Sequence, residues 1–89
     1  MSSTFIARVA HTDGRTEVKR ISFEDARALV GGFVELVYDE PSSCVLFVNE
    51  DGIRLQLPPN PTYRSYVGVI IAVEPHELAL ADTTTEDSK

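Results

Sequence analysis

The sequence predicts an α+β fold in which one short helix packs on a mostly antiparallel, curved sheet of about five to six strands. Three observations predict it: several short segments with strand-like alternation, one segment with helical spacing, and tight-turn signals at Asp13-Gly14 and Asn49–Gly52. The expected element order is β-β-α-β-β-β-β. The 89 residues suit one domain, which we place at residues 1–81, before an acidic tail at residues 82–89 that we expect to be disordered.

The first two strands are expected to form a hairpin around Asp13-Gly14. In Thr4–His11, the side chains at positions 5, 7 and 9 are apolar and share one face. Thr16–Ile21 is rich in charged side chains. It is therefore predicted to be an edge strand, because charges on an exposed edge discourage pairing with another chain.

A short amphipathic helix is expected after Ser22, whose hydroxyl can accept a hydrogen bond from the backbone N–H of Asp25. Apolar residues follow at positions 23, 26, 29 and 30, a spacing that gives the helix one narrow apolar stripe. Gly31-Gly32 ends the helix, since glycine adopts the left-handed conformation at low cost.

Further strands are expected in the second half of the chain. Phe33–Tyr38 and Ile53–Leu57 alternate along their length, whereas Cys44–Val48 and Val67–Val73 are almost wholly apolar. Pro75–Ala81 is either a short helical turn or a final edge strand. Because the two apolar strands offer more apolar surface than one short helix can cover, we expect a homodimer or a larger homo-oligomer.

The composition excludes several classes of protein. Fourteen acidic against eight basic side chains give a formal net charge of −6, which disfavours a nucleic-acid binder because such proteins need a basic patch. One cysteine, Cys44, allows no intramolecular disulfide and no zinc site of several thiolates. The sequence shows neither a secretory signal nor an apolar run of membrane-spanning length. We therefore expect a cytosolic protein that binds neither membranes nor nucleic acid directly.

No group of residues points to catalysis or to a bound metal. The two histidines, His11 and His76, lie outside the predicted core and lack a metal-ligand spacing. Cys44 begins a buried strand, where a packing role is commoner than that of a nucleophile. A strand carboxylate such as Glu35 more often pairs with an arginine or faces solvent than acts as a base. We expect a protein that is not an enzyme and has no cofactor.

The segment after Leu57 is the strongest candidate for a binding site. Three prolines in four residues, in Pro58-Pro59-Asn60-Pro61, stiffen the chain. An amide, guanidinium groups and two phenols in this region can clamp a planar or anionic ligand or form an interface hot spot. A purely structural loop is the alternative. The candidate ligand- or partner-binding residues are Arg54, Asn60, Tyr63, Arg64 and Tyr66.

Three motifs in this sequence resemble those of a known family. Val30-Gly31-Gly32-Phe33-Val34-Glu35, Asn49-Glu50-x-Gly52 and Leu57-Pro58-Pro59-Asn60 follow one another as in the domain of unknown function 3846, before a hydrophobic strand led by Gly68. The match covers roughly Ile21–Val73. The resemblance implies no activity. It does imply a setting, that of a small phage or mobile-element protein in the cytoplasm of a bacterial host.

These features lead to three hypotheses of different classes. The first is a non-enzymatic, phage-encoded accessory protein that binds a host bacterial protein to alter host physiology or counter a defence. The alternative is an oligomeric binder or sponge for a nucleotide-type small molecule, held by Arg54, Asn60 and Arg64 with Tyr63 or Tyr66 stacking. The third is an acidic mimic of nucleic acid, which the scattered positions of the acidic residues make the least favoured.

Overall fold

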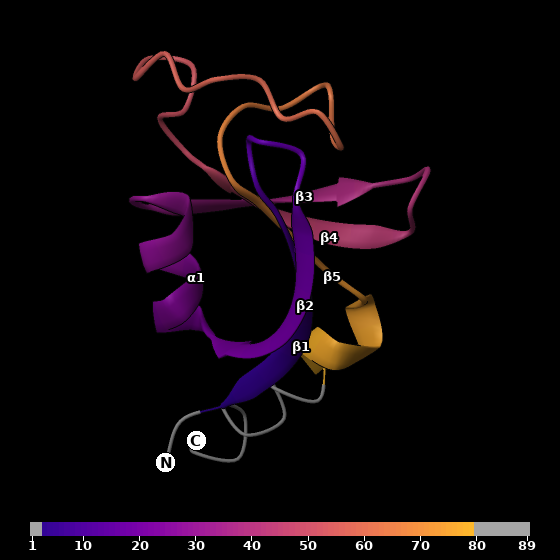
Figure 1. Ribbon diagram of the computed structural model, residues 1–89. Coiled ribbons are helices and arrows are strands. Elements are labelled where there is room, and N and C mark those ends of the chain that lie inside the picture. The colour runs from indigo at the N-terminus through magenta and orange to yellow at the C-terminus, as the bar shows by residue number, and fades with distance from the viewer. Residues whose placement is uncertain (1–2, 80–89) are drawn as a thin grey trace.

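The computed structural model describes residues 3–79, which form a five-stranded sheet, one helix packed on it and a second short helix (Figure 1). The elements are β1 (Thr4–Ala10), β2 (Thr16–Ser22), α1 (Phe23–Val30), β3 (Val34–Asp39), β4 (Cys44–Asn49) and β5 (Ile70–Val73). The second helix covers residues 75–79. The predicted α+β class is confirmed. The predicted domain end at residue 81 and the acidic tail at residues 82–89 lie outside the described residues.

The strands lie in the order β2-β1-β5-β4-β3, and every neighbouring pair is antiparallel. β5, the last strand along the chain, is inserted between the β1–β2 hairpin and the β3–β4 hairpin (Figure 1). The apolar strand that ends at Val73 is therefore central. The charged strand β2 lies at one edge, as predicted. β3 forms the other edge.

The prediction of a strand over Ile53–Leu57 was wrong. Residues 51–56 form consecutive turns, Ile53 is 83% exposed, and the Leu57 N–H donates to the carbonyl of Gly52 at 3.0 Å. Both sides of β4 are occupied, by β3 and β5. An alternating segment directly after β4 therefore finds no adjacent edge with which to form a hairpin.

The other boundaries follow from local conformation. The expected strand Val67–Val73 is shortened at its start because Gly68 has a φ of +81°, and Val67 forms only an isolated bridge with Pro59. For Pro75–Ala81 the sequence allowed either a short helical turn or a final edge strand. The described residues 75–79 are helical. α1 has the predicted ends: Ser22 Oγ accepts from the N–H of Asp25 at 3.1 Å, and Gly31 closes the helix with a φ of +85°.

An aromatic cluster between α1 and the sheet joins the buried rings of Phe5 and Phe47 to Phe23, which is 41% exposed. Phe5, Phe23 and Phe47 approach one another with ring centroids 5.0 to 5.6 Å apart, close enough for favourable ring–ring contacts. The alternation predicted for residues 4–11 is confirmed, since side chains 5, 7 and 9 are buried in this core. Arg8 is exposed on the opposite face.

The opposite face of the sheet is covered by the chain itself. Tyr63 and Tyr66, from the long segment between β4 and β5, pack against a second apolar cluster. That cluster consists of Ala10, Leu46, Val48, Ile70 and Ala72. β4 and β5 are thus covered on both faces within one chain. The apolar surface of these strands is therefore no argument for a homodimer or larger assembly, and that assembly stays a prediction.

Candidate functional site

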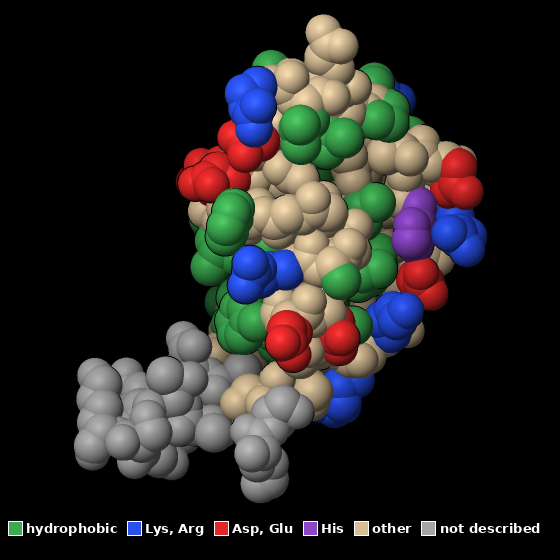
Figure 2. All heavy atoms as spheres, turned by 90° about the vertical axis from the view of Figure 1, so that its left-hand side faces the viewer, with side chains coloured by type: hydrophobic (Ala, Val, Ile, Leu, Met, Phe, Trp, Pro, Cys, Tyr) green, Lys and Arg blue, Asp and Glu red, His purple; other side chains and the backbone are tan. Residues whose placement is uncertain are grey.

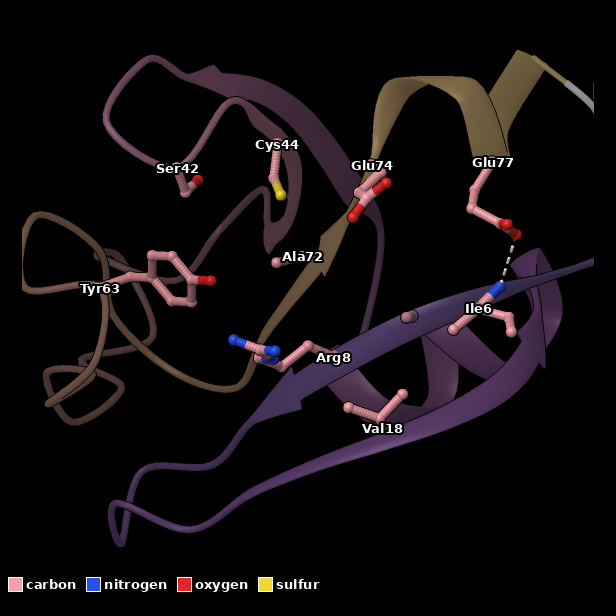
Figure 3. Close-up of a pocket in the computed structure, with 10 residues that line it drawn as sticks. Ile6, Arg8, Val18, Ser42, Cys44, Tyr63, Ala72, Glu74 and Glu77 are labelled. Atoms are coloured by element: carbon pink, nitrogen blue, oxygen red, sulfur yellow. Dashed lines mark hydrogen bonds between the residues drawn. The ribbon is translucent and has the colours of Figure 1, made fainter.

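A groove crosses the face of the sheet opposite α1 (Figure 3). We call it the Arg8–Tyr63 groove, and it has a volume of about 400 Å³. Strands β1, β2 and β5 supply one side, and the segments around β4 and Tyr63 supply the other. The residues on which its chemistry depends are Ile6, Arg8, Val18, Cys44, Tyr63 and Glu74.

Arg8 supplies a positive charge to one end of the groove. It stands on β1 between Val18 of β2 and Ala72 of β5, and its guanidinium extends toward Tyr63 (Figure 3). Among the described residues, no carboxylate oxygen lies within 4.0 Å of this guanidinium. The planar fork of Arg8 is therefore available for a carboxylate or a phosphate brought by a ligand.

Tyr63 supplies a phenol and a flat aromatic surface. Its pKa is raised above the ordinary value, first by burial and then by the neighbouring Cys44, while Arg8 acts in the opposite direction. The phenol therefore stays protonated at neutral pH and can donate a hydrogen bond. A protonated phenol beside a guanidinium presents two donors of different shape to the same ligand.

Two carboxylates lie at the other end of the groove, near the helix at residues 75–79. Glu77 Oε1 accepts a hydrogen bond from the Ile6 N–H at 3.0 Å, which ties this helix to β1 (Figure 3). Glu74 Oε1 lies 3.2 Å from Nδ1 of His76. The groove is thus positive beside Tyr63 and acidic beside the helix, so an asymmetric ligand has one preferred direction.

A second hollow adjoins the groove and shares Ser42 and Tyr63 with it. Arg64 and Tyr66 line this hollow, and Ser42 is held by a 2.6 Å hydrogen bond from its Oγ to Oδ2 of Asp39. Three of the five predicted binding residues, Tyr63, Arg64 and Tyr66, are therefore brought together around one surface.

Asn60 has no free group for a ligand, although we placed it among the binding residues. It is only 1% exposed, and its amide donates to the carbonyls of Ala10 at 3.0 Å and Gly68 at 2.9 Å. Its Oδ1 accepts from the backbone N–H groups of Thr62 and Tyr63. Asn60 is thus an anchor that fixes the backbone of Tyr63 against β1, and a ligand cannot reach it.

Arg54 lies apart from both hollows. It is exposed in the turns after β4 and pairs with Asp51 at 3.2 Å.

Conversely, the sequence prediction missed Arg8, Ser42 and Cys44 as site residues. A signal for Arg8 existed, because the alternation of β1 directs it away from the core. Nothing in the sequence placed it beside Tyr63, since β5 had to be inserted between β1 and β4 first.

The histidines lie away from the centre of the groove. His11 Nε2 lies 2.7 Å from Glu17 Oε2 near the β1–β2 turn, and His76 stands between Glu74 and Glu77 on the surface. Within residues 3–79, no three His, Cys, Asp or Glu side chains are grouped to hold a metal ion. None of the helices in this same range is long and apolar enough to cross a membrane.

The residues of the three sequence motifs make structural contacts, and those of the second and third motifs brace the segment that carries Tyr63. Asn49 Nδ2 donates to the carbonyl of Val30 at 2.9 Å and so joins the first motif to the second. A Cβ on Gly52 would lie 2.8 Å from Cγ2 of Val67, so only glycine fits there. Asn60 of the third motif makes the anchor described above. The motif residues therefore hold the loop in place rather than line the groove.

The fold and the site together define a small antiparallel α+β protein with an open groove that presents an arginine and a tyrosine. The chain belongs to the family described as a domain of unknown function, DUF3846, whose family model matches residues 6–87. The resemblance found in the motifs is thereby confirmed. No curated protein and no solved structure matches the chain.

Proposed function

We propose that this protein is a non-enzymatic accessory protein that binds a host bacterial protein through the Arg8–Tyr63 groove, altering host physiology or countering a defence. The observation that carries the proposal is the Arg8 guanidinium, without a carboxylate partner among the described residues, beside Tyr63. Arginine and tyrosine are enriched among the residues that dominate binding energy at protein interfaces. The phage origin and the bacterial cytoplasm come from the resemblance to the family.

Apolar surface next to these two side chains supports a protein partner. Ile6 and Val18 line the groove and are 42% and 63% exposed. A partner segment with an acidic side chain beside an apolar one matches this arrangement, since the acid pairs with Arg8 while the apolar group covers Val18. Arg64 and Tyr66 extend the same surface into the second hollow.

Site-specific photo-crosslinking in the bacterial host tests this proposal. A photoreactive residue in place of Val18 lies in the groove, and one in place of Ile53 is a matched control that is exposed outside both hollows. We expect one host polypeptide to crosslink from position 18 and not from position 53. Arg8→Glu in the same chain should abolish that product. Equal products from both positions, or a product insensitive to Arg8→Glu, would contradict the proposal.

Binding measurements on the purified protein and the host polypeptide then give the contribution of each side chain to Kd. Arg8→Ala and Tyr63→Ala should each raise Kd by about tenfold or more, the effect expected of an interface hot spot. Arg54→Ala removes an exposed arginine that lies apart from both hollows and should leave Kd unchanged. If Kd rises steeply with salt and responds equally to all surface charges, the acidic-mimic hypothesis is favoured instead.

The size of the groove favours a small acidic ligand as a second candidate. Its volume of about 400 Å³ lies within the range of about 300–1,000 Å³ typical of small-molecule sites. Arg8 would pair with a carboxylate or phosphate, and Tyr63 would cover a planar ring. A native mass spectrum of protein isolated from the host would then show an extra few hundred daltons on the wild type and not on Arg8→Glu.

A further inference from the structure

On the α1 side of the sheet, the outer strand β3 presents apolar side chains where the opposite edge strand β2 presents charged ones. β2 exposes Lys19 and Arg20, which discourage pairing with another strand. β3 instead exposes Leu36 at 54% and Tyr38 at 57% on the side of the sheet that carries α1. An exposed apolar edge is a template for adding a further strand.

The hydrogen-bonding pattern shows which backbone groups of β3 point outward. The carbonyl of Phe33 accepts from the N–H of Glu50 at 2.9 Å, in the same register that pairs β3 with β4. Bonded and non-bonded pairs alternate along an antiparallel ladder. Residues 35 and 37 therefore bond to β4, and the N–H and C=O groups of Val34, Leu36 and Tyr38 face the open edge.

A hollow with a volume of about 300 Å³ lies beside this edge, between β3 and α1. Its lining residues are Phe23, Arg27, Phe33, Val34 and Leu36. The Arg27 guanidinium lies 5.2 Å from the ring centroid of Phe33, in a cation–π contact. Figure 2 looks onto the side of the molecule that carries α1, where apolar side chains reach the surface between charged ones.

We propose that β3 pairs with β3 of a second copy of this chain, antiparallel, about a two-fold axis that passes beside Leu36. Leu36 then faces Leu36 of the partner subunit, and Val34 faces Tyr38 of the partner subunit, each through the outward backbone groups. The two sheets become one continuous sheet. This interface lies at the β3 edge on the α1 side, apart from the Arg8–Tyr63 groove, and it does not depend on the function proposed for the groove.

The charges on β3 select this register over its neighbours. With Leu36 on the axis, Glu35 lies opposite Val37 of the partner subunit, and Asp39 lies opposite the partner's Phe33. If the pairing register shifts by two residues in one direction, Glu35 lies opposite the partner's Glu35. If it shifts by two residues in the other direction, Glu35 lies opposite the partner's Asp39. Like charges directly opposite each other destabilise a sheet, so both shifted registers are disfavoured.

The shape of the surface agrees with the same register. Tyr38 of the partner subunit lies next to Val34, which lines the hollow between β3 and α1. The phenol ring can therefore enter the hollow and cover Phe33 and Leu36. By symmetry, Tyr38 of the first copy enters the hollow of the second, which is the self-complementarity that a two-fold interface requires.

Native mass spectrometry and analytical ultracentrifugation at micromolar concentrations test the interface. We expect a dimer of twice the 9.8 kDa chain. Leu36→Glu places two carboxylates at the axis and should raise the dimer Kd by about tenfold or more. Ile53→Glu makes the same kind of change at an exposed position outside the interface and should leave it unchanged. A monomeric wild type, or a dimer insensitive to Leu36→Glu, would overturn the proposal.

Disulfide trapping in a Cys44→Ser background tests the register itself. Residues that face each other in a bonded antiparallel pair have Cα atoms about 5.5 Å apart, within the range of a disulfide. Leu36→Cys should therefore crosslink two copies under mild oxidation. Tyr38→Cys, on the same exposed edge, should not crosslink two copies. In the proposed register the two cysteines at position 38 lie four residues apart along the paired strands, about 13 Å. Crosslinking through Tyr38→Cys and not Leu36→Cys would refute the register.

Discussion

Replacing Asn60 with alanine removes the anchor between the Tyr63 segment and the sheet. The side chain makes four hydrogen bonds, to two backbone carbonyls and two backbone N–H groups. Each such bond contributes about 0.5–1.5 kcal/mol, and water can reach the partly buried N–H groups of Thr62 and Tyr63 more easily than the two carbonyls. We therefore expect Asn60→Ala to lower the free energy of unfolding by about 2–4 kcal/mol.

Urea and thermal unfolding, followed by circular dichroism, measure this loss. Each kcal/mol corresponds to about 4–8 °C in Tm for a domain of this size. Thr62→Ala is the matched control, because this exposed neighbour uses its backbone and not its side chain in the anchor; its effect should stay within about 0.5 kcal/mol.

Asn60→Asp separates the two halves of the anchor. It keeps an acceptor for Thr62 and Tyr63 but sets a carboxylate oxygen against the carbonyls of Ala10 and Gly68, so it should be at least as destabilising at neutral pH as Asn60→Ala. A loss below about 0.5 kcal/mol for Asn60→Ala would refute the anchoring role.

Three further predictions concern local features of the fold. Gly52→Ala puts a Cβ 2.8 Å from Cγ2 of Val67 and should cost about 1–3 kcal/mol in urea unfolding, more than a substitution with open space around it. Ser22→Ala removes the N-cap of α1 and should cost about 1 kcal/mol; an unchanged unfolding midpoint would contradict the cap. The hydrogen bond with His11 lowers the pKa of Glu17 below its ordinary value of 4.5. Its contribution to stability is therefore present at neutral pH and lost as the pH falls through the lowered pKa in the folded state. In an NMR titration, His11→Ala should raise the Glu17 pKa toward 4.5.

Local patterns were enough to predict the parts of the fold that depend on neighbours in sequence. The β1–β2 hairpin, the capped helix α1 and the charged edge at β2 follow from alternation, turn residues and capping, whose physical causes act within a few residues. The same reasoning failed at Ile53–Leu57, where the alternation is clear but the sheet has no free edge beside β4. It also failed to show that the segment carrying Tyr63 and Tyr66 covers one face of β4 and β5.

The sequence by itself determined the fold class, the edge position of the charged strand β2 and the membership in the DUF3846 family. It also singled out Tyr63, Arg64 and Tyr66. The tertiary structure decided which residues share a surface. The insertion of β5 between β1 and β4 places Arg8 beside Tyr63, buries Asn60, and leaves β3 as an open edge. Each of these three outcomes depends on contacts between segments far apart in the chain. No pattern within a single segment encodes which distant segments become neighbours.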